Sequence, residues 1–476
     1  MKGFATKDEK QERRDAIRRL CDTPAEHIAA MGEESVLRAF NRAAEKIPAY
    51  RAFLNKSGVD ARQINSIEAY RALAPILDKN NIFGETRIRD LCIDGNIDGL
   101  RSIMTSSGHS GIFSFGVSTT ENMESSSQSI DTGLQYFFNV DERSTLLINA
   151  LPMGVKFNTR AAVLAETSVR DDMVCAIVTK FASEFDQIVI VGEGSFIKKI
   201  VEDGKEVHGI DWPSLPVHFI IGEEGIAENY RTYLGSLIGI ADFDDPESKL
   251  VISSMGLAEL DLNIFHETRE SIRIRRLAHG DSTLRQALFG HDYGFCPMFF
   301  VYYPDRCYVE GIEEQTTESE LVISMLSQEL KIPLLRYRSG DYGKEISYNK
   351  VVEVLRQFRH PIEPELKLPF VAVSGRGKSL STDDGLLYPE AVKEALYADH
   401  RIAALATGNF RLTEKNGKAL IEFQLRKGKK AHATAVDDFL IHLAEYSNVS
   451  ASVDFYSYST FPYAMELDWE RKFSYL

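Results

Sequence analysis

The segment with the clearest potential for chemistry is a short loop rich in hydroxyl side chains and glycine. Four hydroxyl residues and two glycines fall within seven positions, in the order Thr105-Ser106-Ser107-Gly108-His109-Ser110-Gly111. Glycine allows backbone N–H groups to converge on an anion, and hydroxyls donate further hydrogen bonds to phosphate oxygens. The loop is therefore a candidate phosphate-binding loop. On composition alone, a flexible surface loop is the more economical interpretation.

Neither this loop nor a second glycine-rich segment has the pattern of a Walker A loop. No Gly-Lys-Ser/Thr sequence follows Gly111. The later segment Gly375-Arg376-Gly377-Lys378-Ser379 imitates the end of such a loop, but the first glycine that the pattern requires falls on Ala372. A P-loop nucleotide site is therefore not expected at either place.

Four histidines and cysteines in the middle of the chain have side chains that could bind zinc. They are His279, His291, Cys296 and Cys307, with spacings of 12, 5 and 11 residues. Structural zinc sites use closely spaced ligand pairs, and none is present here. We do not expect zinc, and we interpret the other three cysteines as inert packing residues.

The elements that position these residues begin with a helical lead-in over residues 1–95. Residues 8–75 read as helical, with apolar side chains at helical spacing from 35 to 47 and Pro48 ending that helix. From about residue 100, strands are expected at 145–151, 187–191, 217–221 and 250–253, alternating with helices at 173–181, 196–202 and 228–238. Such alternation predicts βαβ units and a largely parallel sheet. A second β-rich group follows, including 299–303 and 321–325.

A smaller unit is expected beyond about residue 374. A helix at 388–397 precedes strands at 402–407 and 419–425, a helix at 434–446 and a strand at 451–456. This compact order is typical of a separate α+β domain. The fold class is therefore α/β, with a large N-terminal domain of helices around mixed β-sheets over residues 1–374 and a smaller C-terminal domain over 375–476. The boundary is expected at 374–380.

Composition excludes several classes of partner. The chain has 476 residues, 44% of them hydrophobic, and a formal net charge of −15. This acidity argues against general nucleic-acid binding, which needs a basic face. No run approaches 18 apolar residues, and the N-terminal region is charged, so neither a membrane span nor a secretory signal is expected. Five cysteines without a CxxC pair favour a reduced, cytoplasmic compartment.

Several segments, in order, resemble the adenylate-forming superfamily of acyl-CoA synthetases, adenylation domains and luciferases, and within it the phenylacetate–CoA ligase branch. The matches are Thr105–Gly111 with the phosphate loop, Phe219-Ile220-Ile221-Gly222-Glu223-Glu224 with the adenine-pocket strand, Met255-Gly256-Leu257-Ala258-Glu259 with the Y-G-x-T-E motif, Arg336-Tyr337-Arg338-Ser339-Gly340-Asp341 with R-Y-R-T-G-D, and Ser374-Gly375-Arg376-Gly377-Lys378 with the hinge motif. The segment Lys46-Ile47-Pro48-Ala49-Tyr50-Arg51 resembles an N-terminal signature of the same branch. The resemblance covers residues 40 to 476.

The resemblance implies roles for individual residues. Glu259 is expected to bind Mg²⁺, Arg376 to contact ribose or phosphate, and Lys472, near the C-terminus, to enter the active site during adenylation. Asp341 is expected to accept hydrogen bonds from both ribose hydroxyls. The remaining expected ATP contacts are Thr105, Ser106, Ser107, Gly108, His109, Ser110, Gly111, Gly222, Glu223, Met255, Gly256, Ala258, Arg338 and Lys378.

Three of these positions depart from the family pattern. Met255 stands where a tyrosine stacks on adenine, Ala258 where a threonine contacts the α-phosphate, and His109 where a threonine is usual. A methionine thioether can still pack on a ring, whereas a lost hydroxyl contact is worth about 1 kcal/mol if nothing replaces it. ATP binding is thus expected with altered contacts.

The activity that the resemblance implies is activation of a carboxylic acid by ATP and Mg²⁺, followed by acyl transfer to a thiol as a small mobile domain rotates. Coenzyme A is the expected acceptor. A carrier protein or an amine is an open alternative, as is a non-catalytic homologue that binds a nucleotide. The expected partners are small molecules and, as a further candidate, an acyl carrier protein, with the chain acting as a monomer or homodimer. The sequence does not name the acid.

Overall fold

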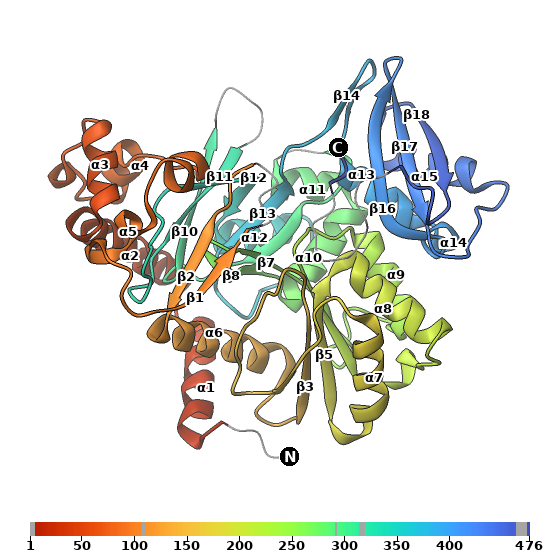
Figure 1. The fold of residues 1–476 in the computed structure, drawn as a ribbon, viewed down its shortest axis with the longest axis horizontal. Coiled ribbons are helices and arrows are strands. Elements are labelled where there is room, and N and C mark those ends of the chain that lie inside the picture. The colour runs from red at the N-terminus through yellow and green to blue at the C-terminus, as the bar shows by residue number, and fades with distance from the viewer. Residues whose placement is uncertain (1–4, 107–110, 291–292, 314–318, 463–473) are drawn as a thin grey trace.

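The chain folds into a large N-terminal part and a smaller C-terminal part that rests on one side of it (Figure 1). This computed structural model describes residues 5–106, 111–290, 293–313, 319–462 and 474–476. The α/β fold class with a large and a small part is confirmed.

The N-terminal helices form the layer at the left of Figure 1 and the long α1 below it. Their bounds are α1 Lys7–Asp22, α2 Ala25–Lys46, α3 Pro48–Lys56, α4 Ile67–Leu73 and α5 Ile88–Leu91, with a π-helical turn, η2, at Asn80–Gly84 and 3₁₀ turns, η1 and η3, at Ala61–Gln63 and Ile93–Gly95. Thr6 starts α1 through a capping box with Glu9. Pro48 both ends one helix and begins the next, because a proline at the first helical position needs no N–H partner.

Eleven strands in the described part of the chain form one mixed sheet, in the order β10-β11-β12-β13-β9-β8-β7-β6-β5-β3-β4. The neighbouring strands β4, β3, β5, β6 and β7 are parallel to one another. The neighbours in the rest of the sheet, β7-β8-β9-β13-β12-β11-β10, are antiparallel. The bounds of the parallel strands are β3 Thr145–Ala150, β4 Val163–Glu166, β5 Gln187–Glu193, β6 Val217–Gly222 and β7 Val251–Leu257. The antiparallel strands are β8 Asp261–His266, β9 Met298–Val301, β10 Cys307–Glu313, β11 Ser319–Met325, β12 Tyr337–Ile346 and β13 Phe370–Gly375.

The predicted parallel sheet therefore exists for the first group of strands, and the second group adds an antiparallel half. Alternate side chains of each parallel strand pack on opposite faces. Leu147 packs with α6 on one face, whereas Ile148 packs with α7 and α8 on the other. The helices on this sheet are α6 Thr120–Phe138, α7 Asp171–Phe181, α8 Gly194–Glu206, α9 Glu228–Ile238, α10 Arg269–Gly280, α11 Ser282–Phe289 and α12 Tyr348–Gln357, with 3₁₀ turns at Ala182–Glu184 and Trp212–Ser214.

Outside the large sheet, one short hairpin carries the hydroxyl-rich loop. Strands β1 Leu100–Thr105 and β2 Phe115–Thr119 pair antiparallel, so the hydroxyl-rich loop connects two paired strands. The α6 helix begins directly after β2, where the side chain of Thr119 accepts a hydrogen bond from the N–H of Asn122.

The chain after β13 forms small sheets of its own. These elements are β14 Leu380–Thr382, β15 Gly385–Leu387, α13 Pro389–Ala398, α14 His400–Ala403, β16 Ala406–Lys415, β17 Lys418–Leu425, α15 Ala435–Tyr446 and β18 Ala451–Tyr456. The predicted strand at 402–407 was wrong in its first half, because Asp399 caps a short helix there. The other predicted elements of this region lie where expected.

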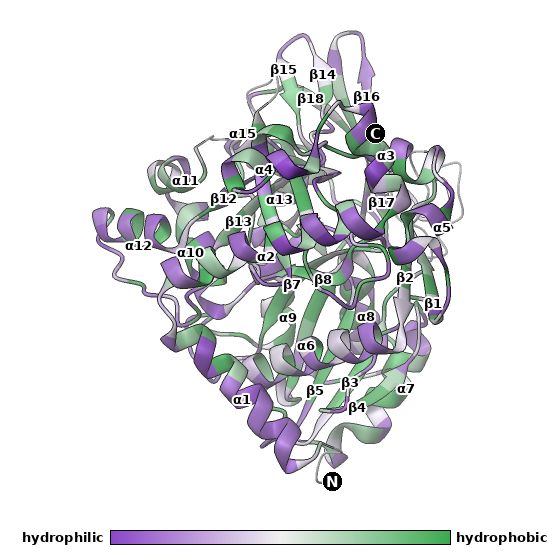
Figure 2. Cartoon of the chain, turned by 90° about the vertical axis from the view of Figure 1, so that its left-hand side faces the viewer, coloured by the Kyte–Doolittle hydropathy of each residue, from purple (hydrophilic) through white to green (hydrophobic). Residues whose placement is uncertain are grey.

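Hydropathy follows this layering. The central strands are green in Figure 2, and the exposed helices α1 and α12 are mostly purple. Among the described residues, none of the helices has the length and apolar character needed to cross a bilayer.

Candidate active site

A cavity of about 640 Å³ lies between α6 and the sheet, at the carboxyl ends of the parallel strands. Its apolar lining comes from the sheet face and the helix that covers it, including Leu134 and Phe137 of α6 and Leu147, Val191 and Ile252 of the strands. In open α/β sheets, ligands bind in the crevice outside the carboxyl ends of the strands. The cavity is thus where the topology predicts a binding site.

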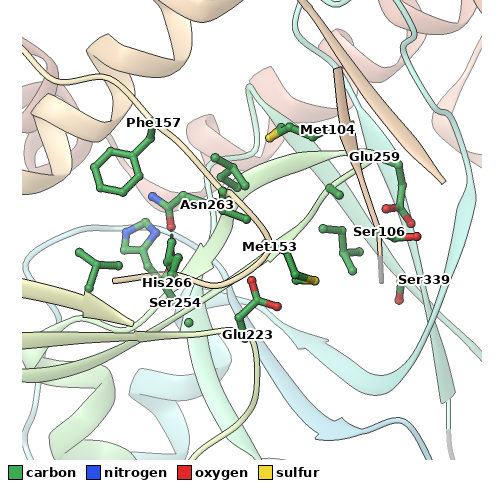
Figure 3. Close-up of a pocket in the computed structure, with 18 of the residues that line it drawn as sticks. Met104, Ser106, Met153, Phe157, Glu223, Ser254, Glu259, Asn263, His266 and Ser339 are labelled. Atoms are coloured by element: carbon green, nitrogen blue, oxygen red, sulfur yellow. Dashed lines mark hydrogen bonds between the residues drawn. The ribbon is translucent and has the colours of Figure 1, made fainter. Parts of the chain in front are cut away.

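The two ends of the cavity differ in chemistry (Figure 3). Phe157, Asn263 and His266 lie at one end, whereas Ser106 and Glu259 lie at the other. The first end combines apolar side chains with the neutral polar groups of Asn263 and His266, whereas the second carries hydroxyl and charged groups. The cavity can therefore hold a molecule with an apolar tail and an anionic head.

The hydroxyl-rich loop borders the polar end. The N–H of Ser106 donates to the carbonyl of Ser114 at 3.1 Å, and the Ser106 hydroxyl accepts from the N–H of Ser114 at 3.0 Å. These bonds close the two sides of the loop. Thr105 and Ser106 line the cavity, whereas Gly111 is exposed, at a φ of 82° that favours glycine. Four predicted residues of this loop lie outside the described residues: Ser107, Gly108, His109 and Ser110.

Glu259 is held in a fixed orientation at the same end. Its carboxylate accepts hydrogen bonds from the Ser114 and Tyr337 hydroxyls, each at 2.8 Å. The backbone holds the two supporting segments close together, since a Cβ at Gly116 would lie 1.8 Å from the carbonyl oxygen of Ala258. Only glycine permits that approach. The sequence indicated Glu259 and placed Tyr337 in a matched motif, but it did not indicate Ser114 or the orienting role of either hydroxyl.

Lys79 is a cation of this site that sequence reasoning missed. Its ammonium donates to the Ser106 hydroxyl at 3.1 Å, and partial burial lowers its pKa, while the Glu259 charge opposes that shift. The segment carrying it is fixed by two backbone hydrogen bonds, from the Leu77 N–H to the Arg336 carbonyl at 2.9 Å and from the Arg338 N–H to the Leu77 carbonyl at 2.8 Å. The sequence around Lys79 resembles an ordinary polar turn. A long-range strand pairing brings it to the loop.

A second hollow of about 230 Å³ adjoins the cavity and shares part of its wall. Glu223, Gly256 and Arg376 line both, and Ser253, Met255 and Asp341 line the second. Among the described residues, the buried Ser253 hydroxyl has no hydrogen-bond partner. A buried hydroxyl without a partner is costly, so it is available to a polar ligand.

The predicted ribose-binding residue lies in the wall of the second hollow. Asp341 is buried, its N–H donates to the Ser339 hydroxyl at 3.2 Å, and the guanidinium of Arg376 lies 3.5 Å from its carboxylate. Arg338 lines the larger cavity and pairs with Glu320 at 2.9 Å. Gly222, Ala258 and Lys378 also line the cavity.

Several residues of the C-terminal part line the second hollow, and two of them bond to one carboxylate of the large part. Glu224 accepts from the Lys393 ammonium of α13 at 2.8 Å and from the Tyr475 hydroxyl at 3.0 Å. Burial and the charge of Glu224 raise the pKa of neighbouring Glu193 to about 8. The segment after β6, predicted to line the adenine pocket, is therefore also a junction between the two parts of the chain.

Two other predictions fall partly outside the described residues. Lys472 lies outside them, as does His291 of the cluster considered for zinc. Cys296 packs against the backbone of Arg275, whereas Cys307 begins β10. The described residues contain no group of three or more histidine, cysteine, aspartate and glutamate side chains arranged to hold a metal ion.

Comparison with known proteins yields a match at the level of structure. No protein-family model matches the chain, and no curated protein matches it by sequence. A crystal structure of 2-hydroxyisobutyryl-CoA ligase in the postadenylation state is similar, with a TM-score of 0.68 and 12% identity over 96% of this chain and 91% of that one. The chain has the fold of this ligase. Its placement in the phenylacetate–CoA ligase branch stays a prediction.

The same ligase in other states is less similar. Its open conformation with 2-HIB-AMP and CoA gives a TM-score of 0.56, and its thioesterification state gives 0.55, at the same 12% identity and over 93% and 94% of this chain. These matches cover 91% and 90% of the ligase chains. The chain as a whole therefore superposes better on the postadenylation structure than on these two.

Proposed function

We propose that the chain is an AMP-forming carboxylate ligase, which activates a carboxylic acid as its acyl-adenylate and transfers the acyl group to coenzyme A. The observation that carries the proposal is the order of three regions along one continuous site. An apolar pocket under α6 leads to Glu259, Lys79 and Ser106, and these lead to the hollow beside Asp341. Acid, phosphates and nucleoside would occupy these regions in that order. The fold shared with a CoA ligase whose structures contain an acyl-adenylate and CoA is consistent with this.

In the first half-reaction, the acid's carboxylate would attack the α-phosphorus of ATP in line and displace pyrophosphate. Negative charge then accumulates on the phosphate oxygens, and preorganised donors lower the barrier most effectively. Lys79 and Ser106 are positioned to donate to those oxygens. Asp341 would accept hydrogen bonds from the ribose hydroxyls, and the Ser253 hydroxyl is available to the base.

Glu259 suits a magnesium ion that is bound jointly with substrate phosphates. Mg²⁺ typically uses one or two protein carboxylates and completes its shell with phosphate oxygens and water. The Glu259 oxygens each accept one hydroxyl hydrogen bond, which leaves further lone pairs for an ion at the cavity wall. When bound there, the ion would supply positive charge to the phosphates. Glu259 would hold that ion in place, with Ser114 and Tyr337 fixing its orientation.

We further propose that residues 375–476 move as a unit between the two half-reactions. The contact between the two parts of the chain is rich in charged pairs, as is usual for domains that change position. Lys198 of α8 donates to the carbonyl of Ala406 at 2.7 Å, and Arg426 pairs with Asp203 at 2.9 Å. The Glu394 carboxylate also accepts hydrogen bonds from N–H groups of Glu228 and Asn229 at the start of α9, at 2.9 and 3.0 Å. These polar contacts can be exchanged for water, whereas the buried rings of Tyr230, Tyr233 and Tyr397, which pack together across the same contact, would have to separate.

An ATP–pyrophosphate exchange assay over a panel of carboxylic acids tests the proposal. Exchange that depends on one class of acid and on Mg²⁺ is the expected result. ATP binding without exchange for any acid would instead identify a nucleotide-binding homologue, which the replacements at Met255 and Ala258 would then explain. Adding CoA, a carrier protein or an amine to the adenylate complex distinguishes the acceptors, and acyl-CoA formation is expected.

A further inference from the structure

The end of the cavity farthest from Glu259 contains a buried polar group with an unused hydrogen-bonding position. His266, the last residue of β8, is 3% exposed and lines the cavity. Its Nε2 lies 3.4 Å from the Tyr303 hydroxyl, and its ring packs edge-on against Phe137 of α6, with centroids 5.7 Å apart. No described residue offers a partner to Nδ1. If this end of the cavity bound only an apolar group, an apolar side chain would serve in place of His266.

A second polar side chain beside the cavity complements this histidine. The Ser254 hydroxyl donates to Oδ1 of Asn263 at 2.9 Å, which fixes the amide so that its Nδ2 donors remain for another acceptor. Figure 3 shows this bond and places Asn263 and His266 at the same end of the cavity. The end wall therefore combines amide donors with one imidazole nitrogen.

The imidazole is neutral, because burial and the charge of Arg306 lower the pKa of His266 to about 4. Its Nδ1 is then either a donor or an acceptor, depending on which nitrogen holds the proton. The charged residues that line the cavity come from other segments, and none of the described residues of α6 or β8 in this wall is charged. An ammonium group bound here would lose its hydration without gaining a counter-charge. A second carboxylate would gain little from Arg306, because that guanidinium is already paired with Asp261.

We propose that this end recognises a hydroxyl group at the distal end of the acid, so that the substrate is an apolar monocarboxylic acid with a hydroxylated tail. This inference rests on the proposed function and specifies its substrate class. A hydroxyl both donates and accepts, so it can pair with Nδ1 in either tautomer while accepting from Asn263. An unsubstituted tail would leave both groups buried and unpaired.

The test compares acids of matched length that end in a methyl, a hydroxyl or a second carboxylate, together with phenyl and 4-hydroxyphenyl alkanoic acids. The measured quantity is kcat/KM in ATP–pyrophosphate exchange. The wild-type chain should prefer each hydroxylated acid over its parent by at least about tenfold, with the dicarboxylic acids least active. His266→Phe, which keeps an aromatic ring without nitrogens, should reduce this preference to about onefold or reverse it while the KM for ATP stays unchanged.

A control variant and a second test variant separate specificity from loss of fold. Phe157→Leu changes a lining residue that offers no polar group, so it should affect hydroxylated and parent acids alike. Asn263→Leu should lower the preference as His266→Phe does. Exchange with every acid at equal kcat/KM in the wild-type chain would overturn this inference and leave the proposed function intact. Such a result would mean that ordered water pairs with His266 and Asn263 whichever acid is bound. Absence of exchange with all acids would reject both.

Discussion

Glu259→Gln separates the charge of this side chain from its shape. The amide has nearly the same size, and the Ser114 and Tyr337 hydroxyls can rotate so that one donates to the amide oxygen and the other accepts from its nitrogen. A hydrogen bond to a carboxylate is worth about 1 kcal/mol more than one to a neutral acceptor, so the variant should lose only about 1–2 kcal/mol of stability. The fold should therefore survive.

The effect on the reaction should be much larger. The amide is a poor ligand for a hard cation, and loss of one preorganised electrostatic contact typically costs about 3 kcal/mol in the transition state, or roughly 10²-fold in rate. The loss also affects Lys79, because the Glu259 charge raises the pKa of this lysine against the effect of burial. In the variant the pKa of Lys79 should fall, so exchange should decline at a lower pH than in the wild type.

The assay is pyrophosphate exchange as a function of Mg²⁺ concentration and of pH, with thermal unfolding as the measure of fold. The expected result is a rate about 10²-fold lower, a higher Mg²⁺ requirement and a melting temperature near the wild-type value. Glu320→Gln is the matched control, since it changes another carboxylate of the cavity wall that pairs with Arg338 instead. Unchanged Mg²⁺ dependence in Glu259→Gln, or an equal change in the control, would refute the assignment.

Four further changes test other parts of the site. Asp341→Ala should raise the Kd for ATP at least about tenfold by calorimetry, through loss of charge-assisted bonds to ribose, and wild-type affinity would contradict the assigned contact. Lys79→Met should slow exchange at least about tenfold while leaving the KM for the acid near its wild-type value, and an unchanged rate would exclude a role at the phosphates. Lys472→Ala should slow adenylation by orders of magnitude but leave thioester formation from a pre-made adenylate almost unchanged; equal impairment of both half-reactions would show another role for the tail. Because the folded pKa of Glu193 is raised to about 8, its contribution to stability is complete at low pH and declines as pH rises from about 4.5 to about 8; Glu193→Gln should flatten the melting temperature over that range, and an unchanged pH profile would refute the shift.

Local patterns were sufficient for most of the secondary structure. The parallel strands are continuous apolar runs bounded by turns, so the predicted strand at 187–191 is matched by β5 at Gln187–Glu193. The predicted strand at 402–407 failed in its first half because one side-chain cap, on Asp399, stabilises a helix of only four residues. Such a short helix leaves almost no periodicity in the sequence.

The sequence also indicated most of the residues at the polar end, because their motifs are short and continuous. Thr105, Ser106 and Glu259 line the larger cavity, and Asp341 lines the second hollow. Their proposed roles, and those of Arg376 and Lys472, stay predictions. By themselves, sequence patterns determined the order of elements, the α/β class and the set of candidate polar residues. These properties depend on propensity and periodicity, which act over a few neighbouring positions.

Only the tertiary structure brought Lys79 and His266 to the cavity. Lys79 reaches Ser106 because Leu77 pairs with the start of β12, more than 250 residues later in the chain. His266 resembles an ordinary core histidine until α6 and β8 enclose it and leave its Nδ1 at the cavity wall without a partner among the described residues. Both outcomes depend on contacts between distant segments, and an isolated sequence window contains no record of such contacts.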